Sequence, residues 1–152
     1  MVDGDRNYEL AGNPSLTLYI ASSSADPAFF AYVEDVAPDG RVTYLTEGLF
    51  RAVHRKAAPQ SRLPYGQTEP AKSYLRQDGE PVHANETVRI EFPIFPIAAL
   101  IRKGHSLRVS LAGADRSAFR HYGSDDEQWS VRHSPLESSA LSLTARPWHR
   151  PD

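Results

Sequence analysis

Apolar and polar residues alternate over several short segments of this chain, which is the period-two pattern of half-buried β-strands. In residues 15–22 (SLTLYIAS), Leu16, Leu18 and Ile20 fall on one face and Thr17 falls on the other. The same alternation predicts further strands over residues 29–36, 42–49, 87–95, 107–111, 129–132 and 140–143. We expect these strands to bury their apolar sides against one another.

Turn residues separate the predicted strands. The tripeptide Pro38-Asp39-Gly40 lies between strands 29–36 and 42–49, and it predicts a β-hairpin because proline presets φ and glycine accepts a positive φ. Pro93 falls within strand 87–95, which places that strand at a sheet edge or at a bulge. We expect residues 97–101 (IAALI) to form one helical turn.

The remaining segments are expected to be irregular. Prolines and glycines interrupt residues 51–81, which predicts a long surface loop, a feature that is often functional in a compact domain. The tails, 1–11 and 145–152, are expected to be loose. Short strands with turns between them, and without alternating helices, predict an all-β fold: an antiparallel sandwich or jelly roll. The length of 152 residues fits a single domain over 1–152.

Composition narrows the classes of partner. The 17 basic and 19 acidic residues leave a net charge of -2, so we expect neither nucleic acid nor an anionic membrane as the main partner. The chain has no cysteine, which removes disulfides and thiolate sites and is compatible with a reducing compartment. The first residues do not resemble a secretory signal, and no apolar run approaches the roughly 20 residues of a membrane-spanning helix. We therefore expect a soluble, cytoplasmic protein.

No motif of catalysis or of cofactor binding is found in the sequence. The G-x-S-x-G turn of serine hydrolases is absent, as are the glycine-rich nucleotide motifs, so neither a catalytic serine nor a nucleotide cofactor is predicted. The six histidines, at positions 54, 83, 105, 121, 133 and 149, lack the helical pair of a zinc site. His83 and His105 would have to converge in three dimensions to bind a metal, and solvated histidines are the favoured interpretation.

Three weaker clusters have both a functional and an ordinary interpretation. The acidic run Asp125-Asp126-Glu127 could bind calcium, although it lacks the EF-hand pattern. A basic cluster beside Phe50 could hold a phosphate or a carboxylate; it consists of Arg51, His54, Arg55 and Lys56. Five aromatic residues could form a sugar-stacking platform: Tyr65, Tyr74, Tyr122, Trp129 and Trp148. Solvated loops and strand ends, and core or interface aromatics, are the favoured interpretations.

Several stretches, in order and spacing, resemble one family over about residues 12–143. They are PSLTLYIAS at 14–22, DPAFFAYVEDVAPDGRV at 26–42, TEGLFR at 46–51, GHSLRV at 104–109 and SALSL at 139–143. Together they are similar to the C-terminal domain of the Xaa-Pro dipeptidyl-peptidase, cocaine esterase and α-amino-acid ester hydrolase group. The resemblance implies a galactose-binding-like jelly roll.

In that group the Ser-Asp-His triad lies on a separate α/β-hydrolase domain, so no catalytic residue is transferred to this chain. The resemblance implies a non-catalytic domain that packs on the hydrolase domain, borders the substrate cleft and supports oligomerisation. Structural roles are expected for the residues that match family motif positions: Asp35, Asp39, Gly40, Gly48, Arg51, Gly104 and His105. The glycines would supply positive φ, and Arg51 would form an ion pair or bind a loop carbonyl.

This chain departs from the family pattern at its start, because members usually have further strands before the position of Pro14. A sandwich without those strands exposes a sheet edge and apolar surface, so we expect a partner: a hydrolase domain or chain, or a second copy. Two alternatives remain open. One is a free-standing carbohydrate-binding module, and the other is an autonomous esterase with an unorthodox site.

Overall fold

The computed structural model describes residues 5–59, 70–120 and 125–149, and it is built from β-strands without any α-helix in these ranges. All strand pairs are antiparallel. One sheet has the order β4 (Val42–Arg51), β3 (Ala28–Val36), β7 (Ser106–Ala112). A second has the order β5 (Val88–Pro93), β2 (Ser15–Ser22), β8 (Trp129–Arg132), and β9 (Ala140–Ser142) also pairs with β2. A third has the order β10 (Ala145–Pro147), β1 (Tyr8–Gly12), β6 (Ile97–Ile101).

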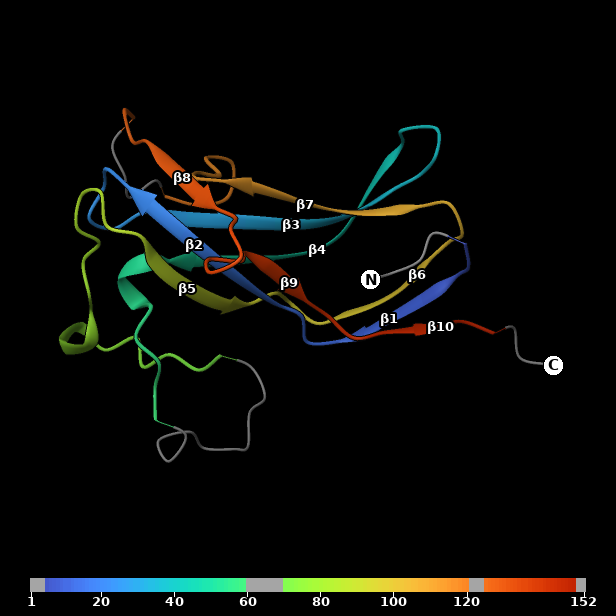
Figure 1. Ribbon diagram of the computed structural model, residues 1–152, viewed down its shortest axis with the longest axis horizontal. Helices are drawn as coiled ribbons and strands as arrows, with labels where there is room; N and C mark the ends of the chain where they lie inside the picture. Colours follow the sequence, from blue (N-terminus) through green and yellow to red (C-terminus); the bar gives the residue numbers. More distant parts are fainter. Residues whose placement is uncertain (1–4, 60–69, 121–124, 150–152) are drawn as a thin grey trace.

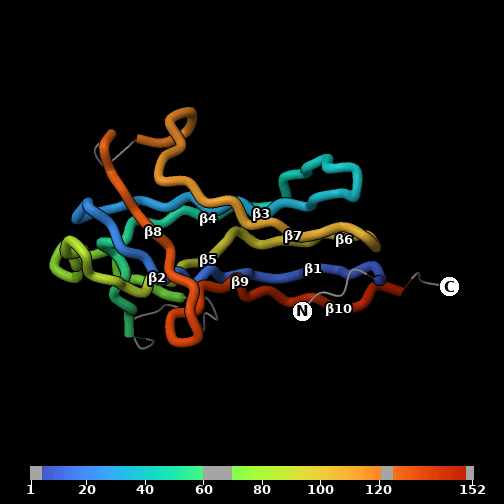
Figure 2. Tube along the Cα trace, turned by 45° about the horizontal axis from the view of Figure 1, so that its top comes forward, coloured from blue at the N-terminus to red at the C-terminus, as the bar shows by residue number. Residues whose placement is uncertain are grey.

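The three sheets form two layers. The β4-β3-β7 sheet is one layer, and the other two sheets lie end to end as the second, with β1 leading into β2 (Figures 1 and 2). The chain crosses from the second layer to the first between β6 and β7. This arrangement confirms the predicted all-β antiparallel sandwich.

The main core fills the space between the two layers over most of their length. It is formed by the alternate residues of β2 and β5, which face Phe29, Ala31 and Val33 of β3. The rings of Phe50 and Phe92 stack with centroids 5.3 Å apart, which joins β4 to β5 across the layers. The faces predicted from the alternation of residues 15–22 and 87–95 are therefore the buried faces.

A second, smaller core lies beneath the third sheet. Leu10, Ile97 and Ile101 are buried there, and Leu45 and Leu107 of the first layer pack against them. Burial of these apolar side chains gives the β10-β1-β6 sheet its own contribution to stability.

Two expectations about secondary structure are wrong. Residues 97–101 form strand β6 rather than a helical turn, because their backbone pairs with β1 over the whole of Tyr8–Gly12. The tails are not loose over their described parts: β1 and β10 pair with each other, with Leu10 opposite Ala145. Short strands of this kind depend on partners far away in the sequence, which local patterns do not reveal.

The described residues after β4, 52–59 and 70–81, are held to the sandwich. They contain two single 3₁₀ turns, η1 (Ala52–His54) and η3 (Arg76–Asp78), and an isolated bridge between Ala57 and Lys72. Pro93 ends β5, which is an edge strand of its sheet, as its proline indicated. Within the described ranges, no helix has the length and apolar character needed to cross a membrane.

Candidate functional site

Two turns meet at the end of the sandwich where the β3–β4 hairpin projects. In the hairpin, Gly40 has a φ of 84° and donates its N–H to the Ala37 carbonyl, while an Asp39 carboxylate oxygen accepts the Arg41 N–H at 3.0 Å. In the β6–β7 turn, Gly104 has a φ of 79°, and a Cβ there would lie 3.4 Å from Pro38 Cγ. Both glycines therefore occupy backbone conformations that other residues rarely adopt.

Asp35 and His105 join these two turns. His105 Nδ1 lies 2.9 Å from each carboxylate oxygen of Asp35, and both side chains are largely buried. His105 also donates its backbone N–H to the Arg102 carbonyl, which fixes the turn before β7. Within the described residues, no serine hydroxyl forms a hydrogen bond with His105. Asp35 thus orients the His105 ring as the acid of a catalytic triad would, but no serine of the described residues completes the triad.

Gly48 and Arg51 lie on β4, away from that pair. A Cβ at Gly48 would lie 2.6 Å from Ile94 Cδ1 and 2.7 Å from the Pro93 carbonyl oxygen, so only glycine allows the segment after β5 to approach β4 this closely. Arg51 forms an ion pair with Asp26, the residue that precedes Pro27 before β3. The sequence did not indicate that Asp26 is the residue with which Arg51 forms its ion pair.

The basic cluster after β4 is already occupied by internal partners. Arg55 binds the Glu80 and Pro81 carbonyl oxygens, and Lys56 Nζ lies 3.0 Å from Asp78. These contacts tie the long loop to η1. They leave little positive charge for a phosphate, which favours the ordinary interpretation of this cluster.

The metal hypotheses gain no support from the described part of the chain. His83 precedes β5 and His105 precedes β7, and the two strands begin at opposite ends of the sandwich (Figure 1). In the acidic run, Asp125 pairs with Arg116 and Glu127 accepts a hydrogen bond from the Ser22 hydroxyl. No group of three or more potential ligands gathers within the described ranges, and His121 lies outside them.

The aromatic residues do not form one platform. Trp129 packs edge-on against Phe29 with ring centroids 5.4 Å apart, and its indole nitrogen approaches Gly113. Tyr74 lies against the His54 ring in the long loop, and Trp148 follows β10 in the other sheet of its layer. Tyr65 and Tyr122 lie outside the described residues.

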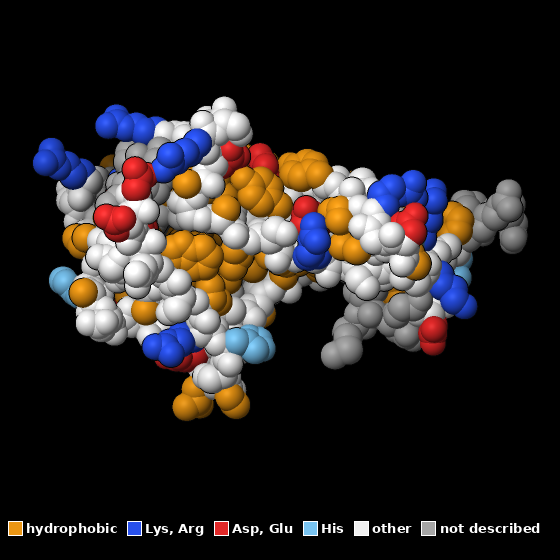
Figure 3. Space-filling view, turned by 90° about the horizontal axis from the view of Figure 1, so that it is seen from above, with side chains coloured by type: hydrophobic (Ala, Val, Ile, Leu, Met, Phe, Trp, Pro, Cys, Tyr) orange, Lys and Arg blue, Asp and Glu red, His pale blue; other side chains and the backbone are white. Residues whose placement is uncertain are grey.

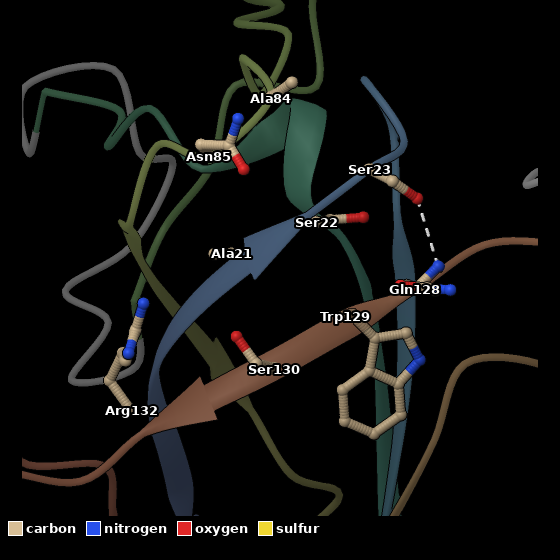
Figure 4. Close-up of a pocket in the computed structure, with 9 residues that line it drawn as sticks. All are labelled: Ala21, Ser22, Ser23, Ala84, Asn85, Gln128, Trp129, Ser130 and Arg132. Atoms are coloured by element: carbon tan, nitrogen blue, oxygen red, sulfur yellow. Dashed lines mark hydrogen bonds between the residues drawn. The ribbon is translucent and has the colours of Figure 1, made fainter.

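A shallow depression of about 400 Å³ lies where β2 ends beside β8. Polar groups line much of it, including Asn85, Gln128, Ser130 and Arg132, and the ring of Trp129 stands at one side (Figure 4). Asn85 has a positive φ of 66°, and Gln128 donates its N–H to the Ser23 hydroxyl. No sequence pattern indicated this depression, because its walls come from three segments that are distant in the sequence, 21–23, 84–85 and 128–132.

The outer face of the β4-β3-β7 sheet holds a polar network that sequence reasoning also missed. Tyr32 donates its hydroxyl to Asp115 at 3.0 Å, and burial together with this contact raises the pKa of Tyr32 to about 12. Glu34 accepts hydrogen bonds from Arg108 and Ser110, which lower its pKa. These bonds connect β3 to β7 and to the loop that follows β7.

Comparison with protein families identifies the chain. A profile of the X-Pro dipeptidyl-peptidase C-terminal non-catalytic domain matches residues 5–144. The chain belongs to this family. A Mycobacterium bovis protein that is provisionally named a serine esterase is 41% identical over 115 residues, which cover 76% of this domain and 18% of that protein. A Mycobacterium tuberculosis protein with the same name and match is a second relative, so the domain spans under a fifth of these curated relatives.

Solved structures have the same fold. A CocE/NonD family hydrolase from Staphylococcus aureus superposes with a TM-score of 0.69 at 18% identity, over 91% of this domain and 28% of that chain. An α-amino acid ester hydrolase gives a TM-score of 0.69 at 16% identity, over 93% and 24%. An aminopeptidase from a Thaumarchaeota archaeon gives 0.67 at 14% identity, also over 93% and 24%. The resemblance inferred from the sequence is confirmed.

Proposed function

We propose that this chain is the accessory β-sandwich of a CocE/NonD-type serine hydrolase. In this proposal it packs on the α/β-hydrolase part, borders the substrate cleft and supports oligomerisation. The observation that carries the proposal is the family match over residues 5–144 in a chain that spans only 18% of its curated relatives. The chemistry, acyl transfer to a serine and then hydrolysis, would belong to the hydrolase part.

The geometry of the residues that match family motif positions supports a structural role for them in this proposal. The seven motif positions lie in the two turns joined by Asp35 and His105, or on β4 where it meets Asp26 and Ile94. Each contact described for them is with this domain's own residues. We extend the proposal to a galactose-binding-like jelly-roll topology and to a cytoplasmic location.

Sedimentation velocity tests the proposal directly. The hydrolase part of the M. bovis relative, produced without the segment that matches this chain, is mixed with the purified domain at micromolar concentration. We expect the two proteins to form a 1:1 complex. The full-length relative is the control: it should form no complex with the domain, because its own C-terminal domain already occupies the contact. Failure of the two proteins to associate at any accessible concentration would contradict the proposal.

Carbohydrate binding is a second candidate, favoured by the polar lining of the depression beside Trp129. Asparagine, glutamine and arginine side chains are suited to hydroxyl groups, but the Trp129 ring is already packed against Phe29. Titration with monosaccharides while tryptophan fluorescence is recorded distinguishes the two functions. An accessory domain leaves the emission unchanged, whereas a sugar-binding module quenches it with saturation.

A further inference from the structure

Exposed apolar side chains gather on the outer face of the β4-β3-β7 sheet, the face that points away from the core. Tyr44 and Leu49 of β4 are 56% and 40% exposed. They stand opposite Glu34 and Phe30 of β3, whose side chains alternate with those in the core and so share this outer face. Phe119, in the loop after β7, is 40% exposed although its ring lies 5.2 Å from that of Phe30. Single apolar residues are common on protein surfaces, whereas neighbouring ones of this size mark interaction sites.

Carboxylates lie among these aromatic side chains. Glu47 of β4 stands opposite Tyr32, and Tyr32 donates its hydroxyl to Asp115. Partial burial, and then the charge and a hydrogen bond of Glu47, raise the pKa of Tyr44. In Figure 3, where the β4-β3-β7 layer lies along the top, acidic and apolar side chains stand next to each other on its outer surface. We call the following six residues the acidic aromatic face: Tyr32, Tyr44, Glu47, Leu49, Asp115 and Phe119.

The negative charge of this face exceeds the positive charge that the described residues place on it. Arg108 pairs with Glu34 at 2.8 Å, but none of the salt bridges found within the described ranges involves Glu47 or Asp115. Arg116, in the same loop as Asp115, pairs with Asp125 instead. Carboxylates beside aromatic rings suit a guanidinium or ammonium group, because the oxygens accept its N–H groups and the ring faces attract its charge. The face therefore fits a partner surface that combines apolar side chains with an arginine or a lysine.

A second copy of the domain does not fit this face in a closed assembly. Two acidic aromatic faces would repel each other through their like charges. The outer face of the second layer does carry arginine, because Tyr19 of β2 stands between Arg89 of β5 and Arg132 of β8. The two outer faces point in opposite directions, however, so copies joined through them would continue as an open filament.

The hydrolase part of the family's proteins is the remaining occupant. The domain covers 18% of its curated relatives, so most of their polypeptide lies outside the matched segment and is available to cover this face. A basic group of that part would pair with Glu47, while apolar side chains around it would bury Leu49 and Phe119. Such a contact joins charge complementarity to the burial of apolar surface, as specific interfaces do.

We propose that the acidic aromatic face is the surface on which the hydrolase part docks, and that an arginine or lysine of that part pairs with Glu47 beside Tyr32 and Tyr44. This inference rests on the proposed function. It gives the contact between the accessory domain and its hydrolase a defined face and a defined chemistry.

Charge reversal at Glu47 tests the inference. The truncated M. bovis relative, shown to be folded by its cooperative melting, is titrated with the domain in a calorimeter. Glu47→Lys should weaken binding at least about tenfold, because it sets two like charges against each other in the contact. Glu137→Lys, in the turn between β8 and β9, makes the same change of net charge away from the face and should bind like the unmodified domain. Glu47→Gln keeps the size of the side chain and should bind severalfold more weakly, which keeps the test decisive if Glu47→Lys does not fold.

The dependence of binding on salt separates an ion pair from apolar contact alone. The affinity of the unmodified domain should fall as the salt concentration rises from about 50 to about 500 mM, because the ions screen the attraction. Glu137→Lys should show the same fall, whereas Glu47→Gln should show a smaller one.

A single label reports whether the face is covered. Because the chain has no cysteine, Leu49→Cys can be labelled at that position alone with a fluorophore whose emission shifts to the blue when water is excluded. We expect this shift when the truncated relative is added. The same label on Leu136→Cys, an exposed position between β8 and β9, is the control and should not respond.

Several results would overturn the inference. If the complex forms but Glu47→Lys binds as tightly as Glu137→Lys, or the label at position 49 does not respond, the docking face is wrong and the accessory function stands. A blue shift that depends on the concentration of the domain alone would place a second copy on the face instead. If the unmodified domain forms no complex at all, the proposed function fails, and the inference fails with it.

Discussion

At the scale of single residues, the contact between His105 and Asp35 is the clearest link between two parts of the fold. It is long-range and largely buried, and it holds the β6–β7 turn against the β3–β4 hairpin. The sequence indicated both positions through the family resemblance, but their partnership follows only from the register of β3 with β7, which pairs Asp35 with Leu107.

Replacement of His105 by alanine should lower the free energy of unfolding by about 1–3 kcal/mol, because the buried Asp35 carboxylate loses its hydrogen-bond partner. Urea denaturation measures the change. His83→Ala, at an exposed position, is the matched control and should be within about 0.5 kcal/mol of the unmodified domain. Equal effects of the two substitutions would show that the Asp35–His105 pair does not stabilise the fold.

Gly48→Ala should destabilise the domain by about 1–3 kcal/mol through overpacking, since the new methyl group meets Ile94 and the backbone of Pro93. Chemical denaturation of this variant can be compared with that of Leu49→Ala, which changes the next residue, 40% exposed, on the other face of β4. A Gly48→Ala domain as stable as the unmodified one would contradict the close approach of the two segments.

The Tyr32–Asp115 contact predicts a loss of stability in alkali. The folded-state pKa of Tyr32, about 12, lies above its ordinary value of 10.0 because burial and Asp115 favour the neutral phenol. The folded state therefore holds the Tyr32 proton more tightly than the unfolded state does. The stabilisation that results is fully present below pH 10 and is lost as the pH rises toward 12. The difference in unfolding free energy between the unmodified domain and Tyr32→Phe should shrink over this interval. A difference that is independent of pH would contradict the assignment.

At the scale of elements, alternation predicted the strands that have one buried face. Residues 15–22 and 129–132 coincide with β2 and β8, and the hairpin around Pro38-Asp39-Gly40 joins β3 to β4. Strand β6 was missed because IAALI is apolar throughout and carries no period that separates a strand from a helix. Strands β1 and β10 were missed because they are short and pair across more than 130 positions.

Leu10→Ala tests whether β1 is an integral element. Leu10 is fully buried in the second core, so its truncation should cost about 2–5 kcal/mol and lower the melting temperature. Leu136→Ala, at a position that is 92% exposed, serves as the control and should leave the transition unchanged. If Leu10→Ala melts like the control, the β10-β1-β6 sheet adds nothing to stability.

At the scale of the whole molecule, the two-layer fold and the family could be inferred from the sequence, whereas the candidate site could not. The depression beside Trp129 is assembled from distant segments, and its position depends on how the sheets stack. Among the described strands, β4 packs against β5 and β6 on one side of the sandwich, and β7 ends its sheet on the other side.

Esterase turnover gives the most direct test of the account as a whole. Hydrolysis of p-nitrophenyl acetate is followed for the domain alone, for the truncated M. bovis relative alone, and for their mixture. We predict no turnover above buffer for the domain alone, and higher turnover for the mixture than for the truncated relative. Turnover by the domain alone that a serine-reactive phosphonate abolishes, with no effect of mixing, would contradict the account.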